Sequence, residues 1–140
     1  MEQVKKLLSK NKLMVILIVL VAVPAQAEVW VEIGSDNDSV HYVDRDSLSR
    51  EQDVVTLQKK VVYNEPQISA FTKGSEPVKY SLGTLQEDCT GRQHRVVSID
   101  LYSEAGEVIW SSGRMNRVWE SVEPDSVGAN VHTLACGKCN

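Results

Sequence analysis

A two-residue alternation of apolar and polar side chains is the feature that most restricts how this chain can fold. It is clearest from Asp53 to Tyr63, where successive side chains of an extended segment fall into two rows. The first row is mainly apolar, although a lysine interrupts it, and consists of Val55, Leu57, Lys59, Val61 and Tyr63. The second row is more polar and consists of Val54, Thr56, Gln58, Lys60 and Val62. Two such rows are typical of an antiparallel sheet that is covered on one face.

The alternation continues along most of the chain. The predicted strands are 29–33, 40–43, 53–63, 78–89, 92–102 and 107–111. Residues rich in Asp, Asn, Ser and Gly separate several of them and favour tight turns, for example at 34–38, 44–47 and 104–106. Short strands joined in this way indicate an antiparallel meander.

The end of the chain has a helical pattern instead. Pro124-Asp125-Ser126 is typical of a helix start, with Asp125 or Ser126 as the N-cap. Val127, Val131 and Leu134 then recur at helical spacing, and Gly137 is a suitable stop. We therefore predict an α+β fold, an antiparallel meander sheet of five to six strands with one C-terminal helix packed on a face.

The N-terminus has the three parts of a secretory signal. Four lysines precede an uncharged apolar block from Leu13 to Val23, and Pro24 and Ala25-Gln26-Ala27 follow it. The block is shorter than the ~20 apolar residues that a membrane-spanning helix needs. We predict a signal peptide at 1–27 that is cleaved after Ala27, and a single domain at 28–140. This places the mature protein in the periplasm, on the outer surface or in the medium, with no membrane span after cleavage.

Charge disfavours two classes of partner, nucleic acid and anionic lipid surfaces. Loss of residues 1–27 removes four lysines and one glutamate, which leaves 11 basic and 18 acidic residues and changes the net charge from −4 to −7. Nucleic acid requires a net basic surface, and anionic lipid repels an acidic protein. We therefore expect a protein partner and no nucleic acid.

Three cysteines in an exported chain imply one disulfide and one further thiol. The spacing alone allows Cys89–Cys136, Cys89–Cys139 or Cys136–Cys139. The last pair has the C-x-x-C spacing of redox enzymes, but in those enzymes the first cysteine lies at a helix N-terminus, where the helix dipole lowers its pKa. Here the pair follows the predicted helix, so a thiol oxidoreductase is disfavoured.

No other side chains suggest chemistry. His41, His94 and His132 are not spaced as metal ligands, and Asp36-Asn37-Asp38 is better explained as a turn than as part of a calcium loop. We predict no catalytic residue, no cofactor and no metal site.

The remaining class of function is surface contact with another molecule, and two features of the sequence could provide it. The loop from Glu65 to Pro77 is longer than a plain connection and contains Ile68 and Phe71, which either tuck under the loop or form a contact site. Cationic residues of several strands could also gather into one patch, although scattered, solvated charges are the simpler expectation. They are Lys59, Lys60, Lys79, Arg92, Arg95, Arg114 and Arg117.

Several short motifs occur in an order that resembles the surface-adhesin protein E family of Gram-negative bacteria. They are Trp30, Tyr42-Val43-Asp44 with Ser47, Cys89 after Glu87-Asp88, Trp119 with Pro124 and Ser126, and a terminal helix that carries Cys136. The resemblance implies a twisted antiparallel sheet, a helix packed on it, and a disulfide from helix to sheet, hence Cys89–Cys136. For the family's best-known member it also implies surface exposure and binding of host proteins such as vitronectin and laminin.

We therefore predict an exported, non-enzymatic binding module that contacts host or envelope proteins, such as extracellular-matrix or serum proteins. The open edges of a meander would also allow a homodimer. The rival interpretations are a periplasmic structural or inhibitor-like module that binds another protein, and a thiol oxidoreductase that uses Cys136 and Cys139.

Overall fold

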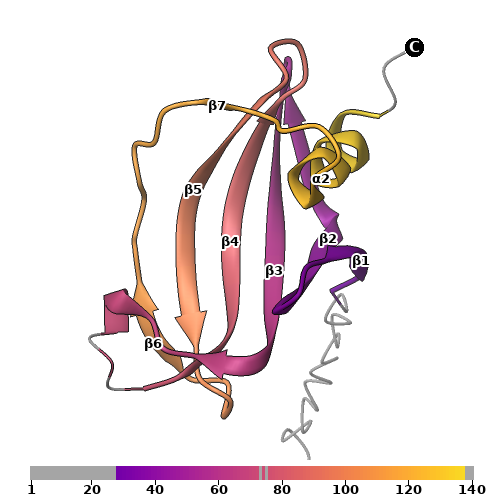
Figure 1. Ribbon diagram of the computed structural model, residues 1–140. Helices are drawn as coiled ribbons and strands as arrows, with labels where there is room; N and C mark the ends of the chain where they lie inside the picture. The colour runs from indigo at the N-terminus through magenta and orange to yellow at the C-terminus, as the bar shows by residue number, and fades with distance from the viewer. Residues whose placement is uncertain (1–27, 73, 75, 138–140) are drawn as a thin grey trace, which may run out of the picture.

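The computed structural model describes residues 28–72, 74 and 76–137, and these residues form one antiparallel sheet with a helix against it (Figure 1). The strands are β1 (Trp30–Ser35), β2 (Ser39–Glu51), β3 (Val54–Gln67), β4 (Val78–Asp88), β5 (Gln93–Tyr102), β6 (Val108–Ser111) and β7 (Glu120–Ser121). Strands β1 to β6 lie side by side in chain order, and β7 pairs with β5. The predicted fold class is confirmed, with more strands than expected because two-residue β7 joins the sheet.

Strand β2 is much longer than the sequence suggested. Residues 44–47, which we expected to end a short strand, lie inside it, and its pairing with β3 shifts register between Asp44 and Ser49. The Ser47 hydroxyl occupies this irregularity: it donates to the Asp44 carbonyl at 2.6 Å and accepts from the Gln58 amide at 2.8 Å. The turn-forming residues therefore make a bulge, because side-chain hydrogen bonds replace the interrupted backbone pairing.

The C-terminal helix, α2 (Val127–Cys136), begins and ends as its sequence predicts. The Ser126 side chain caps it by accepting a hydrogen bond from the Ala129 amide at 3.1 Å. Gly137 ends it with φ of 81°, and its amide donates to the Thr133 carbonyl. The short 3-10 helix η1 (Ala70–Thr72) lies in the loop between β3 and β4.

The core lies where α2 meets the sheet. It is centred on Val43, Leu57 and Val131, each 1% exposed or less, from β2, β3 and α2. Partly buried side chains surround them, namely Ile33, Leu48, Leu85, Leu134 and Ala135. Because α2 contacts β1 to β4, it covers only one end of this sheet face (Figure 1).

A long connection runs from β6 to α2 beside the free side of β5 (Figure 1). Backbone amides of this connection bond to β5, from Ser112 to the Ile99 carbonyl and from Met115 to the Val97 carbonyl. Strand β7 then pairs with the start of β5 before the chain turns into α2. The connection therefore forms a side wall for the part of the sheet face that α2 leaves uncovered.

The predicted signal peptide, residues 1–27, lies outside the described residues. Within the described part of the chain, no helix has both the length and the apolar character needed to cross a membrane.

Candidate binding surface

Strand register assigns the side chains to two faces. On the face that carries α2, here called the helix-bearing face, Leu57 of β3 lies opposite Leu85 of β4, and Leu85 lies opposite Val96 of β5. Because alternate residues share a face, Ser81 and Leu101 belong to it as well. Lys60, Tyr80 and Tyr102 lie on the opposite face.

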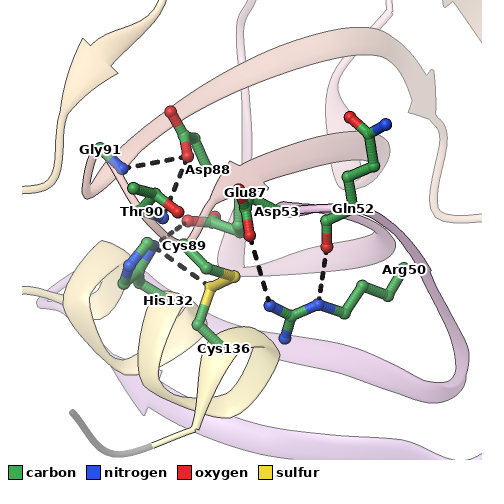
Figure 2. Close-up of a disulfide and its surroundings, with 10 residues drawn as sticks. All are labelled: Arg50, Gln52, Asp53, Glu87, Asp88, Cys89, Thr90, Gly91, His132 and Cys136. Carbon is green, nitrogen blue, oxygen red and sulfur yellow. Dashed lines mark hydrogen bonds and ion pairs between the residues drawn. A yellow bond between two sulfur atoms is a disulfide. The ribbon is translucent and has the colours of Figure 1, made fainter.

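A disulfide ties α2 to the sheet at the covered end of the helix-bearing face (Figure 2). It joins Cys89, which directly follows β4, to Cys136 in the last turn of α2, and their Cα atoms are 5.4 Å apart. The turn after Cys89 is stabilised by Asp88, whose carboxylate accepts from the amides of Thr90 and Gly91. Helix and sheet are thus linked covalently at the edge of the core.

A buried hydrogen bond adjoins this disulfide (Figure 2). Nδ1 of His132 on α2 lies 2.7 Å from Oε2 of Glu87 on β4, and these residues are 4% and 0% exposed. Burial raises the pKa of Glu87, although the hydrogen bond from His132 opposes this rise. The pair holds α2 on the sheet, since an ionised Glu87 separated from His132 would be a buried, unpaired charge.

A hollow of about 150 Å³ lies beside this pair, between α2, β5 and the connection. Its charged and titratable lining consists of Lys59, Glu87, His94, Arg95, Arg117 and Glu120. Burial lowers the pKa of Lys59, while the nearby carboxylate of Glu87 acts to raise it. Helix α2 packs closely against β5 here. A Cβ atom on Gly128 would lie 3.3 Å from Cε1 of His94 on β5.

The uncovered end of the helix-bearing face contains a larger groove, of about 580 Å³. The rings of Phe71, from η1, and Trp110, from β6, stack over it with centroids 4.7 Å apart. Phe71 nevertheless remains 65% exposed, and Ile68 remains 67% exposed. The predicted loop therefore supplies apolar groups that rim a groove and stay accessible to solvent.

The stacking partner of Phe71, Trp110, is not evident from the sequence alone. Trp110 lies on a four-residue strand at the end of the sheet. Its position on a short edge strand was the available signal, because an aromatic residue there has little neighbouring sheet to cover it.

On the opposite face, the aromatic residues pack against other side chains of the same face. Lys60 lies over the rings of Trp30 and Tyr42, with its Nζ 4.4 and 5.6 Å from their centroids. Tyr80 and Tyr102 stack with centroids 4.6 Å apart. Burial raises the pKa of Tyr102, and the nearby carboxylate of Asp100 adds to the effect.

The cationic residues do not gather into one patch. Lys59, Arg95 and Arg117 line the small hollow, but Lys60 belongs to the opposite face. Arg95 is also engaged elsewhere, since it lies over Trp119 at 4.4 Å and donates to Gln86. Lys79 donates to two backbone carbonyls at the end of β3.

The remaining histidine and its acidic neighbours form a turn. Nε2 of His41 lies 3.1 Å from Asp36, which also accepts hydrogen bonds from the amides of Asp38 and Ser39. These hydrogen bonds hold the pKa of Asp36 well below its usual range, and burial lowers the pKa of His41. Among residues 28–72, 74 and 76–137, no three His, Cys, Asp or Glu side chains are arranged to hold a metal ion.

Two solved structures of Haemophilus influenzae protein E are similar to this chain. The first has 14% sequence identity and a TM-score of 0.53, over 81% of this chain and 96% of that one. The second, from crystal form II, has 13% identity and a TM-score of 0.52, over 79% of this chain and 95% of that one. At these identities the likeness concerns the fold alone. No curated protein matches the chain in sequence.

The motifs that carry the family resemblance lie mainly at structural positions. Val43 is in the core, Ser47 fills the bulge, and Ser126 caps α2. The sequence profile of the surface-adhesin protein E family matches residues 30–137, which include all of these positions. The chain therefore belongs to the surface-adhesin protein E family.

Proposed function

We propose that the mature chain, residues 28–140, is an exported, non-enzymatic binding module that contacts host or envelope proteins. The observation that carries this proposal is the groove at the uncovered end of the helix-bearing face, where Phe71 and Ile68 remain exposed. Exposed apolar side chains that lie together along one groove are typical of interaction sites. Membership of a family of surface adhesins supports the same proposal.

The composition of the groove suits a protein partner. It combines two aromatic rings, Phe71 and Trp110, with Met115 and Arg117 from the connection. Aromatic residues, Met and Arg are the residue types enriched in protein interfaces. A partner side chain that covered the stacked rings would remove apolar surface from water without any change in the sheet.

The disulfide favours binding over redox catalysis. Cys136, the first cysteine of the C-x-x-C sequence, is bonded to Cys89 of the sheet. A thiol oxidoreductase would need Cys136 to exchange with Cys139 during each cycle, which would release α2 from the sheet. This cost supports a structural role for the bond.

Binding to purified host proteins tests the proposal. The mature protein, immobilised through its C-terminus, is exposed to vitronectin, laminin and an unrelated serum protein. Saturable binding to a matrix protein but not to the unrelated protein is expected. Failure to bind either matrix protein, together with capture of a periplasmic partner, would favour the inhibitor-like interpretation.

Location distinguishes an adhesin from a periplasmic module. Protease added to intact cells should degrade the protein if it lies on the outer surface. Protection until the outer membrane is permeabilised would instead place it in the periplasm and contradict host contact.

Self-association is a further part of the proposal. Strands β1 and β6 lie at the two ends of the strand order, so each presents unpaired backbone groups that a second copy could use. Sedimentation of the mature protein over a range of concentrations should show a monomer–dimer equilibrium, and a constant monomer would exclude it.

A further inference from the structure

The groove and the small hollow are parts of one trough along β5. Val96 and Arg117 line both spaces, so the two meet at these residues. The groove extends from this point toward Phe71 and Trp110, and the hollow extends toward α2. The trough therefore has an apolar half and a charged half.

The apolar half has the character of a small-molecule site. Its volume of about 580 Å³ falls within the range of about 300–1,000 Å³ that is typical of ligand pockets. Sheet residues form its floor, and aromatic rings form one rim. The apolar residues along it are Val96, Ile99, Leu101, Trp110, Phe71 and Met115.

The charged half contains two cationic side chains, those of Lys59 and Arg117. Among the described residues, neither side chain forms a hydrogen bond or an ion pair. Lys59 is half-buried, and a cation in such a position gains from an anion brought close to it. Of the acids in the hollow, Glu87 acts electrostatically on Lys59 but is hydrogen-bonded to His132 and forms no ion pair with Lys59 within 4.0 Å, and Glu120 is exposed on β7.

We propose that this trough binds a free fatty acid, with its acyl chain along the groove and its carboxylate between Lys59 and Arg117. This ligand would occupy the same groove as the protein partner proposed above, but its binding is measured without that partner. An apolar chain that ends in a single anionic group matches an apolar groove that ends at two cations. The size of the hollow, about 150 Å³, selects a carboxylate over the larger head group of a phospholipid.

The contributions of the acyl chain and of the carboxylate to the affinity can be predicted separately. Complete burial of a methylene group tightens binding by about fourfold. Each step from octanoate to decanoate to dodecanoate adds two methylene groups, so the dissociation constant should fall by up to about fifteenfold per step. A hydrogen bond to a charged group contributes about tenfold or more, so decanoate should bind about tenfold more tightly than decanol.

Calorimetric titration of the mature protein, below the critical micelle concentration, tests both predictions. Lys59→Gln and Arg117→Gln should each weaken decanoate binding by about tenfold and leave decanol binding unchanged. Lys60→Gln is the matched control, because Lys60 is the next residue of β3 and points to the opposite face. Lys59→Arg should retain most of the affinity, and exposed Arg117 provides a second test if Lys59→Gln does not fold.

The position of the acyl chain in the groove can be tested separately. Decanoate should shift the indole NMR resonance of Trp110 and leave that of Trp30, on the opposite face, unchanged. The proposal is wrong if the alcohol binds as tightly as the acid, if Lys60→Gln weakens binding as much as Lys59→Gln, or if no saturable binding occurs. Tighter binding of a single-chain phospholipid than of a fatty acid of equal chain length would also overturn it.

Discussion

Replacement of Cys89 or Cys136 by serine should destabilise the domain by roughly 2–5 kcal/mol. The two cysteines lie 47 positions apart, and the entropy of closing a loop of this length in the unfolded chain gives about 4 kcal/mol. Apart from the disulfide, few buried side chains hold the helix: α2 has 10 residues, of which only Val131 and His132, the partner of Glu87, are buried. Full burial of one valine contributes about 1.5–3 kcal/mol before entropy is subtracted.

Urea unfolding of the oxidised mature protein, followed by circular dichroism, measures this effect. The two single variants and the double variant should lose the same free energy of unfolding, because each breaks the same bond. Cys139→Ser is the control and should change stability little, since that residue follows Gly137, where the helix ends. A loss of less than about 1 kcal/mol in Cys89→Ser would refute the reasoning. A non-reducing peptide map that contained Cys136–Cys139 would refute the pairing and revive the redox hypothesis.

Four further outcomes follow from the structure. Burial raises the pKa of Glu87, so its contribution to stability is complete below the ordinary value of 4.5 and is lost as pH rises through the raised pKa. Glu87→Gln, which does not titrate at this position, should therefore gain stability relative to the parent protein as pH rises above 4.5 in urea titrations. Ser126→Ala should cost about 1 kcal/mol of unfolding free energy, because the Ala129 amide loses its cap. Gly34→Ala should cost about 1–3 kcal/mol in the same assay, since Gly34 has φ of +154° and a Cβ there would lie 3.2 Å from Val127. N-terminal sequencing of the envelope protein should begin at Glu28, and a sequence that begins at Met1 would contradict export with cleavage.

The fold class could be predicted because local patterns agree with it. The alternation from Asp53 to Tyr63 corresponds to β3, and the spacing of Val127, Val131 and Leu134 corresponds to α2. Ser126 and Gly137 act as the cap and stop that their residue types predict. These features depend on neighbours in the sequence, and so the sequence alone reveals them.

Features that depend on distant residues could not be predicted. Asp44 to Ser47 has the composition of a turn, but it lies within β2 at a register shift, where strand pairing on both sides and the bond from Gln58 to Ser47 keep it extended. Glu87 and His132 are 45 positions apart, and only the docking of α2 brings them together. The stacking of Phe71 on Trp110 likewise requires the loop to fold back over β6.

The central claim is that the uncovered end of the helix-bearing face is the surface that contacts partners. The most direct test compares the affinity of two double variants for the matrix protein that binds the mature chain. Phe71→Ala with Trp110→Ala removes the stacked pair at the groove, and Tyr80→Ala with Tyr102→Ala removes the matched pair on the opposite face. We expect the affinity to fall by at least about tenfold for the first variant and to change little for the second. Equal affinity of the first variant and the parent protein, or a loss confined to the second, would contradict it.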